Sequence, residues 1–281
     1  LGTSGAETLS AAANVFVGQT EAPLVIRPYV SKMTQSELMA VMVGGFATIA
    51  GGVLAAYVSF GIDAGHLITA SVISAPAALL IAKVMQPETE HSVTMGKVEL
   101  HVQDKESNLI EAAASGATAG MKLAINVAAM LIAFLAIIAM VNGLIGWTGT
   151  WFGFEEAHRW TLEKGLGWLF WPLAYLMGIP AADCGAAGQL LGTKMVANEF
   201  VAYLQLGELM KAGPQTLSPR TVTILTYALC GFANFGSIGI QLGGIGGVAP
   251  DRRGDLARLG LRAMIGGTLA AFMTACIAGI I

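Results

Sequence analysis

Three consecutive polar residues at positions 19–21 interrupt the apolar stretch that runs from Asn14 to Leu24. Residues 10–16 before them are small and apolar, which is typical of a short helix. Pro23 after them suits the first turn of a second helix, because its missing N–H group is not needed there and its φ is already fixed. Gly18 gives the chain the freedom to turn between the two helices. The pattern therefore predicts a re-entrant helical hairpin with a polar tip.

The composition of the chain makes this polar tip significant. Of the 281 residues, 55% are hydrophobic and 12% are charged, whereas soluble domains carry about 25% charged residues. The apolar runs are long and do not alternate, which favours membrane-spanning helices over a membrane β-barrel. Irregular backbone is tolerated within a bilayer only where protein buries it or where it lines a cavity, and a carboxylate there is costly. Glu21 is therefore a candidate functional residue.

The first part of the chain, residues 1–86, is expected to form one unit of three membrane elements. These elements are the hairpin at 1–30, a broken helix at 36–62 and a plain helix at 67–85. The break is expected near Thr48, because glycine is a poor helix former and four glycines surround this residue. They are Gly44, Gly45, Gly51 and Gly52.

The middle of the chain, residues 87–162, is expected to connect two such units. It begins with a polar connector, in which the alternation at 98–102 predicts a short extended piece. Residues 108–120 are typical of an interfacial amphipathic helix. Residues 123–147 form an apolar run without charge, long enough for the ~20 residues that a membrane span needs. We interpret this run as a scaffold helix.

Residues 163–281 are expected to form a second unit of the same kind. It would contain a hairpin at 163–206 that turns at 178–185, a broken helix at 217–247 and a plain helix at 256–281. Asp183 lies in the expected turn and is interpreted as a helix cap rather than as a ligand-binding group.

Two short sequence matches indicate that the two units are repeats. Residues 45–51 (GFATIAG) match residues 231–237 (GFANFGS), and Asn14-Val-Phe16 matches Asn198-Glu-Phe200. A single scaffold helix between the units would place them in opposite orientations. The fold class predicted from these features is an all-α polytopic membrane protein with inverted repeats around a scaffold helix. Paired interrupted segments in corresponding halves of a transporter point to its binding site.

The polar residues at the four interruptions suggest what such a site could bind. Backbone carbonyls, a hydroxyl and an amide oxygen suit a hard cation such as Na⁺. The side chains at the tips and breaks can bond a polyhydroxylated or amide-bearing ligand, and Phe232 offers an aromatic face to a planar ring. These polar side chains are Gln19, Thr20, Glu21, Glu199, Asn234 and Ser237.

At these residues the chain resembles the concentrative nucleoside transporters. The strings at 18–24 (GQTEAPL), 198–200 (NEF) and 231–237 carry the resemblance, which covers essentially the whole chain. It implies a Na⁺-coupled nucleoside symporter, rather than an enzyme, that works by alternating access as a homotrimer in the inner membrane of a bacterium. A nucleoside such as uridine and the lipid bilayer are the expected partners, and no nucleic acid is expected. The family has three further helices before the first hairpin, which we expect to precede Leu1.

The resemblance also implies a role for each candidate site residue. Gln19 and Thr20 would bond the nucleobase, and Glu21 would assist through water. The remaining substrate residues would be Val53 and Phe232, packed on the base, and Glu199, Asn234 and Ser237, on the ribose hydroxyls. Sodium would be held by the side chains of Asn14 and Thr48 and by the carbonyls of Val17, Thr48 and Ile49.

Several alternatives remain open from the sequence. A proton-coupled nucleoside transporter is the nearest, although the intact string at 19–23 favours sodium. An ion channel is the rival from another class, because re-entrant hairpins also build pores. At single residues, Thr48 could bond its own preceding turn, Glu199 could pair with Lys194 or Lys211, and Asn234 could cap a helix. The arginine-rich loop at 251–262 predicts the cytoplasmic side of the membrane.

Overall fold

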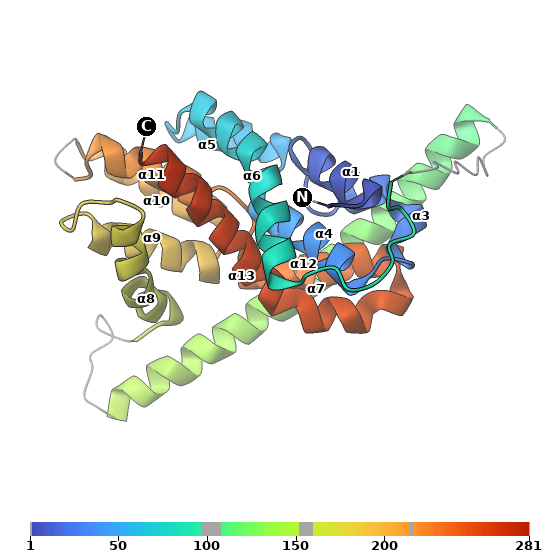
Figure 1. The fold of residues 1–281 in the computed structure, drawn as a ribbon. Helices are drawn as coiled ribbons and strands as arrows, with labels where there is room; N and C mark the ends of the chain where they lie inside the picture. The colour runs from blue at the N-terminus through green and yellow to red at the C-terminus, as the bar shows by residue number, and fades with distance from the viewer. Residues whose placement is uncertain (1, 97–107, 152–159, 214–215, 281) are drawn as a thin grey trace.

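The computed structural model describes residues 2–96, 108–151, 160–213 and 216–280, and within these ranges the regular structure is helical. The first half of the chain (blue to cyan in Figure 1) lies beside the last helices (orange and red), so segments far apart in sequence meet at the centre of the molecule. The first-half helices are α1 (Gly5–Asn14), α2 (Ala22–Val25), α3 (Arg27–Val30), α4 (Gln35–Ala47), α5 (Gly51–Ser59) and α6 (Ala64–Met85).

Two interruptions shape the first half. The chain leaves α1 at Asn14 and enters α2 at Ala22, and we call the connecting residues 15–21 the first tip. Residues 48–50 separate α4 from α5, where the surrounding glycines predict an unwound centre, and we call them the first break. Both α1 and α4 begin with a capping box, in which a Ser or Thr and a Glu bond each other's backbone N–H groups. These caps fix where the two helices start.

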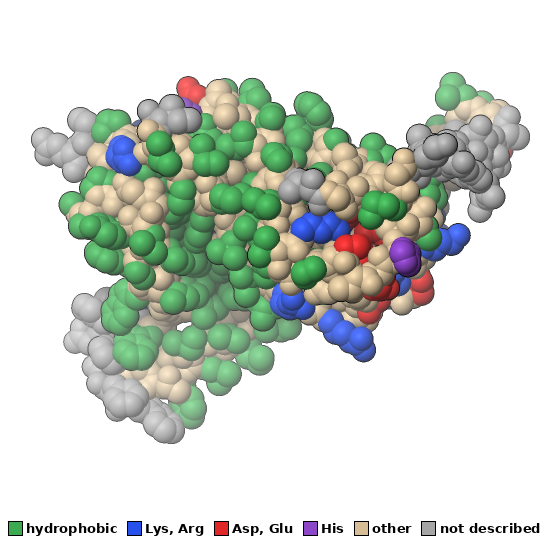
Figure 2. Space-filling view, in the orientation of Figure 1, with side chains coloured by type: hydrophobic (Ala, Val, Ile, Leu, Met, Phe, Trp, Pro, Cys, Tyr) green, Lys and Arg blue, Asp and Glu red, His purple; other side chains and the backbone are tan. Residues whose placement is uncertain are grey.

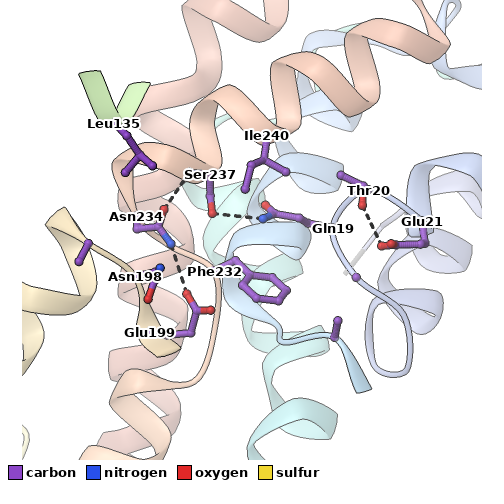
Figure 3. Close-up of a pocket in the computed structure, with 13 residues that line it drawn as sticks. Gln19, Thr20, Glu21, Leu135, Asn198, Glu199, Phe232, Asn234, Ser237 and Ile240 are labelled. Carbon is purple, nitrogen blue, oxygen red and sulfur yellow. Dashed lines mark hydrogen bonds between the residues drawn. The ribbon is translucent and has the colours of Figure 1, made fainter. Parts of the chain in front are cut away.

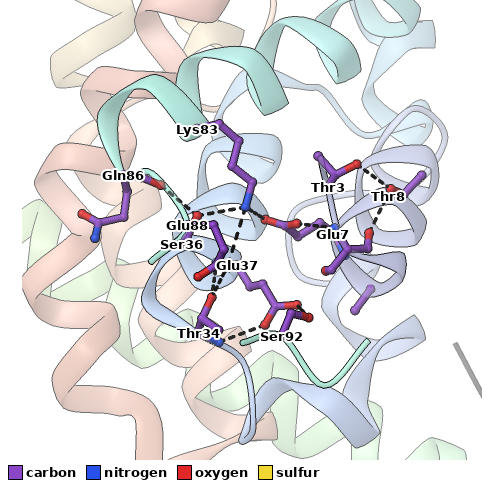
Figure 4. Close-up of polar contacts among 12 residues, drawn as sticks. Thr3, Glu7, Thr8, Thr34, Ser36, Glu37, Lys83, Gln86, Glu88 and Ser92 are labelled. Carbon is purple, nitrogen blue, oxygen red and sulfur yellow. Dashed lines mark hydrogen bonds and ion pairs between the residues drawn. The ribbon is translucent and has the colours of Figure 1, made fainter. Parts of the chain in front are cut away.

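A buried polar cluster joins the starts of α1 and α4 to the end of α6 (Figure 4). The ammonium of Lys83 on α6 lies 2.5 Å from a carboxylate oxygen of Glu7 and donates to the hydroxyl of Ser36 at 2.9 Å. Glu37 accepts a hydrogen bond from Ser92 in the segment that follows α6. Glu7 and Glu37 are buried, so their carboxylates need these partners in place of water. The contacts therefore hold the three helices together at one end of the molecule.

The centre of the chain forms one long helix, α7 (Leu109–Trp151). The expected interfacial helix at 108–120 and the expected scaffold helix at 123–147 are therefore continuous rather than separate. The sequence explains this, because residues 109–151 contain no proline and are rich in alanine, the best helix former. The extended piece expected at 98–102 lies outside the described residues.

The second half contains α8 (Leu162–Leu176), α9 (Cys184–Val196) and α10 (Glu199–Lys211) where a single hairpin at 163–206 was expected. The expected turn lies between α8 and α9, and a second interruption, Ala197–Asn198, separates α9 from α10. We call it the second tip. The helices α8 and α9 approach closely because Gly188 and Gly192 face the backbone of Gly167 and Glu163. This G-x-x-x-G spacing is typical of helix contacts in membranes.

The chain ends with α11 (Pro219–Leu229), α12 (Phe235–Val248), a short 3₁₀ turn at Pro250–Arg252 and α13 (Arg253–Ala278). Residues 230–234, which we call the second break, separate α11 from α12. Gly231 has a φ of +120°, and its backbone lies against the carbonyls of Phe46 and Ala47 at the end of α4. Only a residue without a Cβ atom allows the second break to approach the end of α4 this closely.

The surface agrees with a membrane environment. In the described part of the chain, four segments are long and apolar enough to cross a bilayer, namely Gln35–Ser59, Ala64–Met85, Ile132–Gly149 and Pro250–Ala278. Figure 2 shows hydrophobic side chains over most of one face, with charged side chains gathered at one end. That charged end contains the start of α13, where Arg252 donates to the carbonyls of Ser31 and Met33.

Candidate functional site

A cavity of about 310 Å³ lies where the two tips and the two breaks converge (Figure 3). It brings together seven of the eight predicted substrate residues, including Glu21 from the first tip and Glu199, which directly follows the second tip. The exception is Val53, which is half-buried against the hydrophobic core. The cavity is lined by Gly18, Gln19, Thr20, Glu21, Ala50, Leu135, Ala197, Asn198, Glu199, Phe232, Asn234, Ser237 and Ile240.

Glu199 is the buried carboxylate of the cavity, with 5% of its surface exposed. It occupies the first position of α10, directly after the N-cap Asn198, whose side chain accepts from the N–H of Val201 at 2.9 Å. The positive end of the helix dipole favours a negative charge at this position. Tyr57 donates its hydroxyl to one carboxylate oxygen at 3.1 Å, and Asn234 donates its amide to the other at 3.2 Å. The alternative pairing with Lys211 is not formed.

Asn234 links this carboxylate to the first half of the molecule. It is the N-cap of α12 and accepts from the N–H of Ser237 at 2.8 Å, so it both caps a helix and bonds Glu199. The hydroxyl of Ser237 in turn accepts from the amide of Gln19 at 3.2 Å. A continuous chain of hydrogen bonds therefore crosses the cavity from Glu199 at the start of α10 to Gln19 in the first tip.

Gln241 extends this chain and was not expected from the sequence. It lies one turn after Ser237 on α12, is fully buried, and donates to the side chain of Gln19 at 3.1 Å and to the carbonyl of Met42 at 3.0 Å. A glutamine at this helical spacing from Ser237 could have been recognised as facing the same side. Gln241 holds the amide of Gln19 in one orientation.

The rim of the cavity is formed by the rest of the first tip. Thr20 donates its hydroxyl to Glu21 at 2.9 Å, and the carboxylate of Glu21 is exposed. The predicted stacking residue, Phe232, lies in the second break and is half-buried at the cavity wall (Figure 3). The cavity thus has a polar wall, an acidic group on each side and one aromatic face.

The residues expected to hold sodium lie at the junction of the first tip and the first break. Gly51 N–H donates to the carbonyl of Phe16 at 3.1 Å, which fastens the tip to the break. Asn14 is 1% exposed, and among the described residues neither polar atom of its side chain has a hydrogen-bond partner. A buried amide without partners is rare and requires an explanation. A bound cation would supply one for its oxygen.

Thr48 lies at the start of the first break. Its hydroxyl donates to the carbonyl of Gly44 at 2.9 Å, which is the bond to the preceding turn that the sequence left open. The hydroxyl oxygen keeps lone pairs for a second interaction. The carbonyl of Thr48 accepts from the N–H of Phe232 at 3.2 Å, so the first break is bonded directly to the second. The carbonyls of Val17 and Ile49 lie in the same unwound segments.

The second break is supported by a buried lysine. Lys194 on α9 is 2% exposed and donates to the carbonyl of Ala228 at 2.9 Å, and Tyr203 donates to the carbonyl of Thr226 at 2.7 Å. Both carbonyls belong to the last turn of α11, whose carbonyls have no partner within the helix. Nothing in the sequence around Lys194 indicates this role. Its direct partner is a backbone carbonyl, although Glu199 lies close enough to interact with its charge.

Comparison with known proteins agrees with this geometry. Residues 66–279 match the model of the Na⁺-dependent nucleoside transporter C-terminus, and residues 1–64 match a nucleoside recognition (gate) model. The whole chain is 53% identical to an uncharacterized transporter of Haemophilus influenzae and covers 67% of it. It is 45% identical to sodium/nucleoside cotransporter 2 of Rattus norvegicus, of which it covers 44%.

Solved structures of CNTnw show the same fold. An inward-facing, substrate-bound structure matches with a TM-score of 0.80 and 52% identity, covering the whole chain and 65% of CNTnw. Structures of two variants in an outward-facing state match at 0.88 and 0.89, with 51% identity and 66% coverage. The chain thus spans about two thirds of its bacterial relative and of CNTnw, and less than half of the mammalian relative. The chain belongs to the concentrative nucleoside transporter family, whose members are integral membrane transporters rather than enzymes.

Proposed function

We propose that this chain forms the core of a sodium-coupled nucleoside symporter in the inner membrane of a bacterium. The observation that carries the proposal is the pairing of two features. One is the hydrogen-bonded wall from Glu199 to Gln19, and the other is the unpartnered amide of Asn14 behind the same tip. The first feature suits a polyhydroxylated ligand, and the second suits a cation.

The nucleoside would bind between the two tips. The carboxylate of Glu199 is held by two donors and can accept further bonds from ribose hydroxyls, which would be charge-assisted and therefore strong. Asn234 and Ser237 stand beside it on the same wall. The base would lie against Phe232 and reach Gln19 and Thr20, with Glu21 at the rim acting through water.

Sodium would bind at the junction of the first tip and the first break. Asn14, Thr48 and nearby carbonyls offer neutral oxygen ligands, which suit a hard cation. The ion would order the first tip and the first break, which the Gly51–Phe16 hydrogen bond joins. Because the carbonyl of Thr48 accepts from the N–H of Phe232, the ion would also order the backbone of Phe232. Sodium binding would therefore complete the nucleoside site. By thermodynamic linkage, the nucleoside would strengthen sodium binding by the same factor.

Alternating access is supported by the comparison with CNTnw. The TM-scores against its outward-facing variants exceed that against its inward-facing form. We infer that the present structure resembles an outward-facing state, with the charged end at the cytoplasm because it is rich in arginine. Assembly as a homotrimer follows from the family resemblance and remains part of the proposal.

Two rival functions make different predictions. A proton-coupled transporter would use a titratable group, whereas the unpartnered group at the junction is the amide of Asn14, which does not titrate. An ion channel would need a continuous pore, whereas buried hydrogen bonds of Gln241 tie Gln19, at the cavity wall, to the carbonyl of Met42. Both observations favour sodium symport.

Uptake of radiolabelled uridine into proteoliposomes tests the proposal. We expect accumulation that requires an inward sodium gradient, persists when a proton ionophore is present, and is competed by other nucleosides. Accumulation driven by a proton gradient without sodium would contradict the proposed coupling. Sodium current in the absence of any nucleoside would instead support a channel.

A further inference from the structure

Tyr57 on α5 lies behind the cavity between the two tips, which we call the nucleoside cavity, and it bonds the buried carboxylate there. None of the surface of Tyr57 is exposed. The cavity wall in front of it is formed by Ala197, Asn198 and Glu199. The hydroxyl of Tyr57 donates to Oε1 of Glu199 at 3.1 Å. Tyr57 therefore acts on a ligand in the cavity only through Glu199.

The ring of Tyr57 is held by two aromatic neighbours on α10. Its centroid lies 4.5 Å from that of Tyr203 and 6.2 Å from that of Phe200. Aromatic pairs at such separations attract each other in addition to the effect of burial. Tyr203 is itself anchored, since its hydroxyl donates to the carbonyl of Thr226 at 2.7 Å. These contacts fix the point from which the Tyr57 hydroxyl donates.

The two donors on Glu199 divide its acceptor capacity evenly. Tyr57 donates to Oε1, and Asn234 donates to Oε2 at 3.2 Å (Figure 3). An ionised carboxylate offers about four lone-pair sites on its two oxygens. Each oxygen therefore keeps a free site for a ligand. Because the two donors come from different halves of the chain, they also prevent the carboxylate from rotating.

One free acceptor site on each carboxylate oxygen suits a pair of neighbouring hydroxyls. In a ribonucleoside the 2′- and 3′-hydroxyls lie on the same face of the sugar, and both can donate. Hydrogen bonds to an ionised acceptor are strong, but every hydrogen bond weakens steeply when its donor is misaligned. A carboxylate that rotated freely would align with one hydroxyl at a time. Simultaneous bonding of both hydroxyls thus requires a fixed carboxylate.

We propose that Tyr57 is a positioning residue for ribose recognition, which fixes the carboxylate of Glu199 so that both oxygens accept from the two neighbouring sugar hydroxyls. The proposal rests on the proposed transport function and deepens it. It makes the preference for ribonucleosides over dideoxynucleosides depend on a side chain outside the cavity. Without the Tyr57 hydroxyl, Glu199 would keep its place but would lose the donor that holds Oε1.

Tyr57→Phe tests this role, because it removes only the hydroxyl and keeps the ring against Tyr203 and Phe200. The affinities of uridine and 2′,3′-dideoxyuridine would be measured by competition against labelled uridine, in the complete protein with saturating sodium. Tyr227→Phe is the matched control, since Tyr227 is also buried and its hydroxyl bonds His66 at 3.1 Å.

We expect Tyr57→Phe to weaken uridine binding by about five- to tenfold, as for the loss of one hydrogen bond. Binding of 2′,3′-dideoxyuridine should not change, because this ligand lacks both hydroxyls. The ratio of the two affinities should therefore fall in Tyr57→Phe and stay at the parent value in Tyr227→Phe. An unchanged ratio in Tyr57→Phe, including an equal loss of both affinities, would overturn the proposal. Failure of the parent to bind uridine would instead contradict the transport function itself.

A second measurement uses the parent alone, so it remains decisive if Tyr57→Phe does not fold. In arabinosyluracil the 2′-hydroxyl points to the opposite face of the sugar from the 3′-hydroxyl. Only one of the two can then bond the fixed carboxylate. The parent should bind arabinosyluracil at least about tenfold more weakly than uridine, as for the loss of one bond to a charged group. Equal affinities would overturn the two-hydroxyl geometry on which the role of Tyr57 depends.

Discussion

The first and second breaks differ in what stabilises their exposed backbone. At the second break, the chain provides its own cation, since Lys194 donates to the carbonyl of Ala228 and Tyr203 bonds the carbonyl of Thr226. At the first break, no side-chain cation plays that part among the described residues, and the adjacent amide of Asn14 has no partner there. The two interruptions are similar in sequence, yet only the second is stabilised by charged and polar side chains of the protein itself, which is why we propose an ion from solution for the first.

This comparison assigns a role to each break. The second break is stabilised by side chains of the protein itself, Lys194 and Tyr203, whether or not an ion is bound. It can therefore hold Glu199 and Asn234 in place at all times. In the proposed function, a bound ion would complete the first break, so the break would report the presence of sodium to the nucleoside cavity. We therefore expect one sodium ion per nucleoside, bound at the first break.

Removing the internal cation should have the largest effect. Lys194→Met leaves the carbonyl of Ala228 without its donor and removes a charge that faces Glu199. A hydrogen bond to a charged group contributes about 1.5–3 kcal/mol, and leaving a buried acceptor without its donor costs about 1–3 kcal/mol, so we expect a marked fall in the melting temperature measured by fluorescence in detergent. Lys211→Met is the matched control, because Lys211 is exposed on α10. Equal melting temperatures for both variants would show that Lys194 does not support the second break.

The next largest effect is expected from Glu199→Gln, which keeps the shape of the side chain and removes its charge. Hydrogen bonds to charged groups contribute about 1.5–3 kcal/mol, so uridine affinity measured by calorimetry should fall by one to two orders of magnitude. Glu208→Gln, at an exposed position of the same helix, should leave it unchanged. Unaltered uridine affinity in Glu199→Gln would remove this residue from the ribose-binding role.

A smaller effect is expected at the first break from Thr48→Ala. Loss of one oxygen ligand should weaken sodium binding and, through linkage, uridine binding, each by about tenfold for 1.4 kcal/mol. Thr48→Ser keeps the hydroxyl and should restore both affinities. Sodium titrations of uridine binding would measure this. If the Ala variant kept the full sodium dependence of the parent, Thr48 would not belong to the cation site.

The smallest effect is expected from Asp183, whose hydrogen bonds join the start of α9 to the start of α11 in the second half. Asp183 accepts from the N–H and hydroxyl of Ser218 at 3.0 and 2.8 Å and from the hydroxyl of Thr221 at 2.6 Å, and the bond from Thr221 is the main cause of its lowered pKa. A carboxyl whose folded pKa is lowered stabilises the protein above its ordinary pKa, and this contribution is lost as the pH falls through the folded value.

We therefore expect the melting temperature of the parent to fall between about pH 5 and pH 3 by more than that of Asp183→Asn. At neutral pH the variant should be less stable by about 1 kcal/mol, the usual contribution of a hydrogen bond. Identical pH profiles of the two proteins would show that Asp183 does not fasten α9 to α11.

Much of the fold follows from local sequence signals. Apolar runs predict the membrane helices, and glycines around Thr48 predict the break between α4 and α5. The continuity of α7 was missed because residues 108–120 are more polar than the run that follows, although helix propensity does not change there. The second tip at Ala197–Asn198 was missed because no glycine or proline marks it. Only the N-cap geometry of Asn198 defines it.

The sequence predicted the site residues in the tips and breaks, but it did not predict the residues on the helices that support them. The strings at 18–24 and 231–237 contain most residues of the cavity wall, because tips and breaks are local features. Lys194 and Tyr57 could not be selected in this way, since each acts through a contact between helices distant in sequence. Gln241 could have been recognised only from its helical spacing to Ser237. Asp183 was expected to be a helix cap; it occupies the N-cap position of α9, but its carboxylate bonds Ser218 and Thr221 at the start of α11.

The central claim is that a single cation completes the first break through Asn14. The most direct measurement is the dependence of the uridine dissociation constant on sodium concentration, in the parent and in Asn14→Ala. Linkage to one ion predicts a slope of about −1 for log Kd against log sodium concentration in the parent, below saturation, and a slope near zero in the variant. The same slope in both proteins would contradict the account.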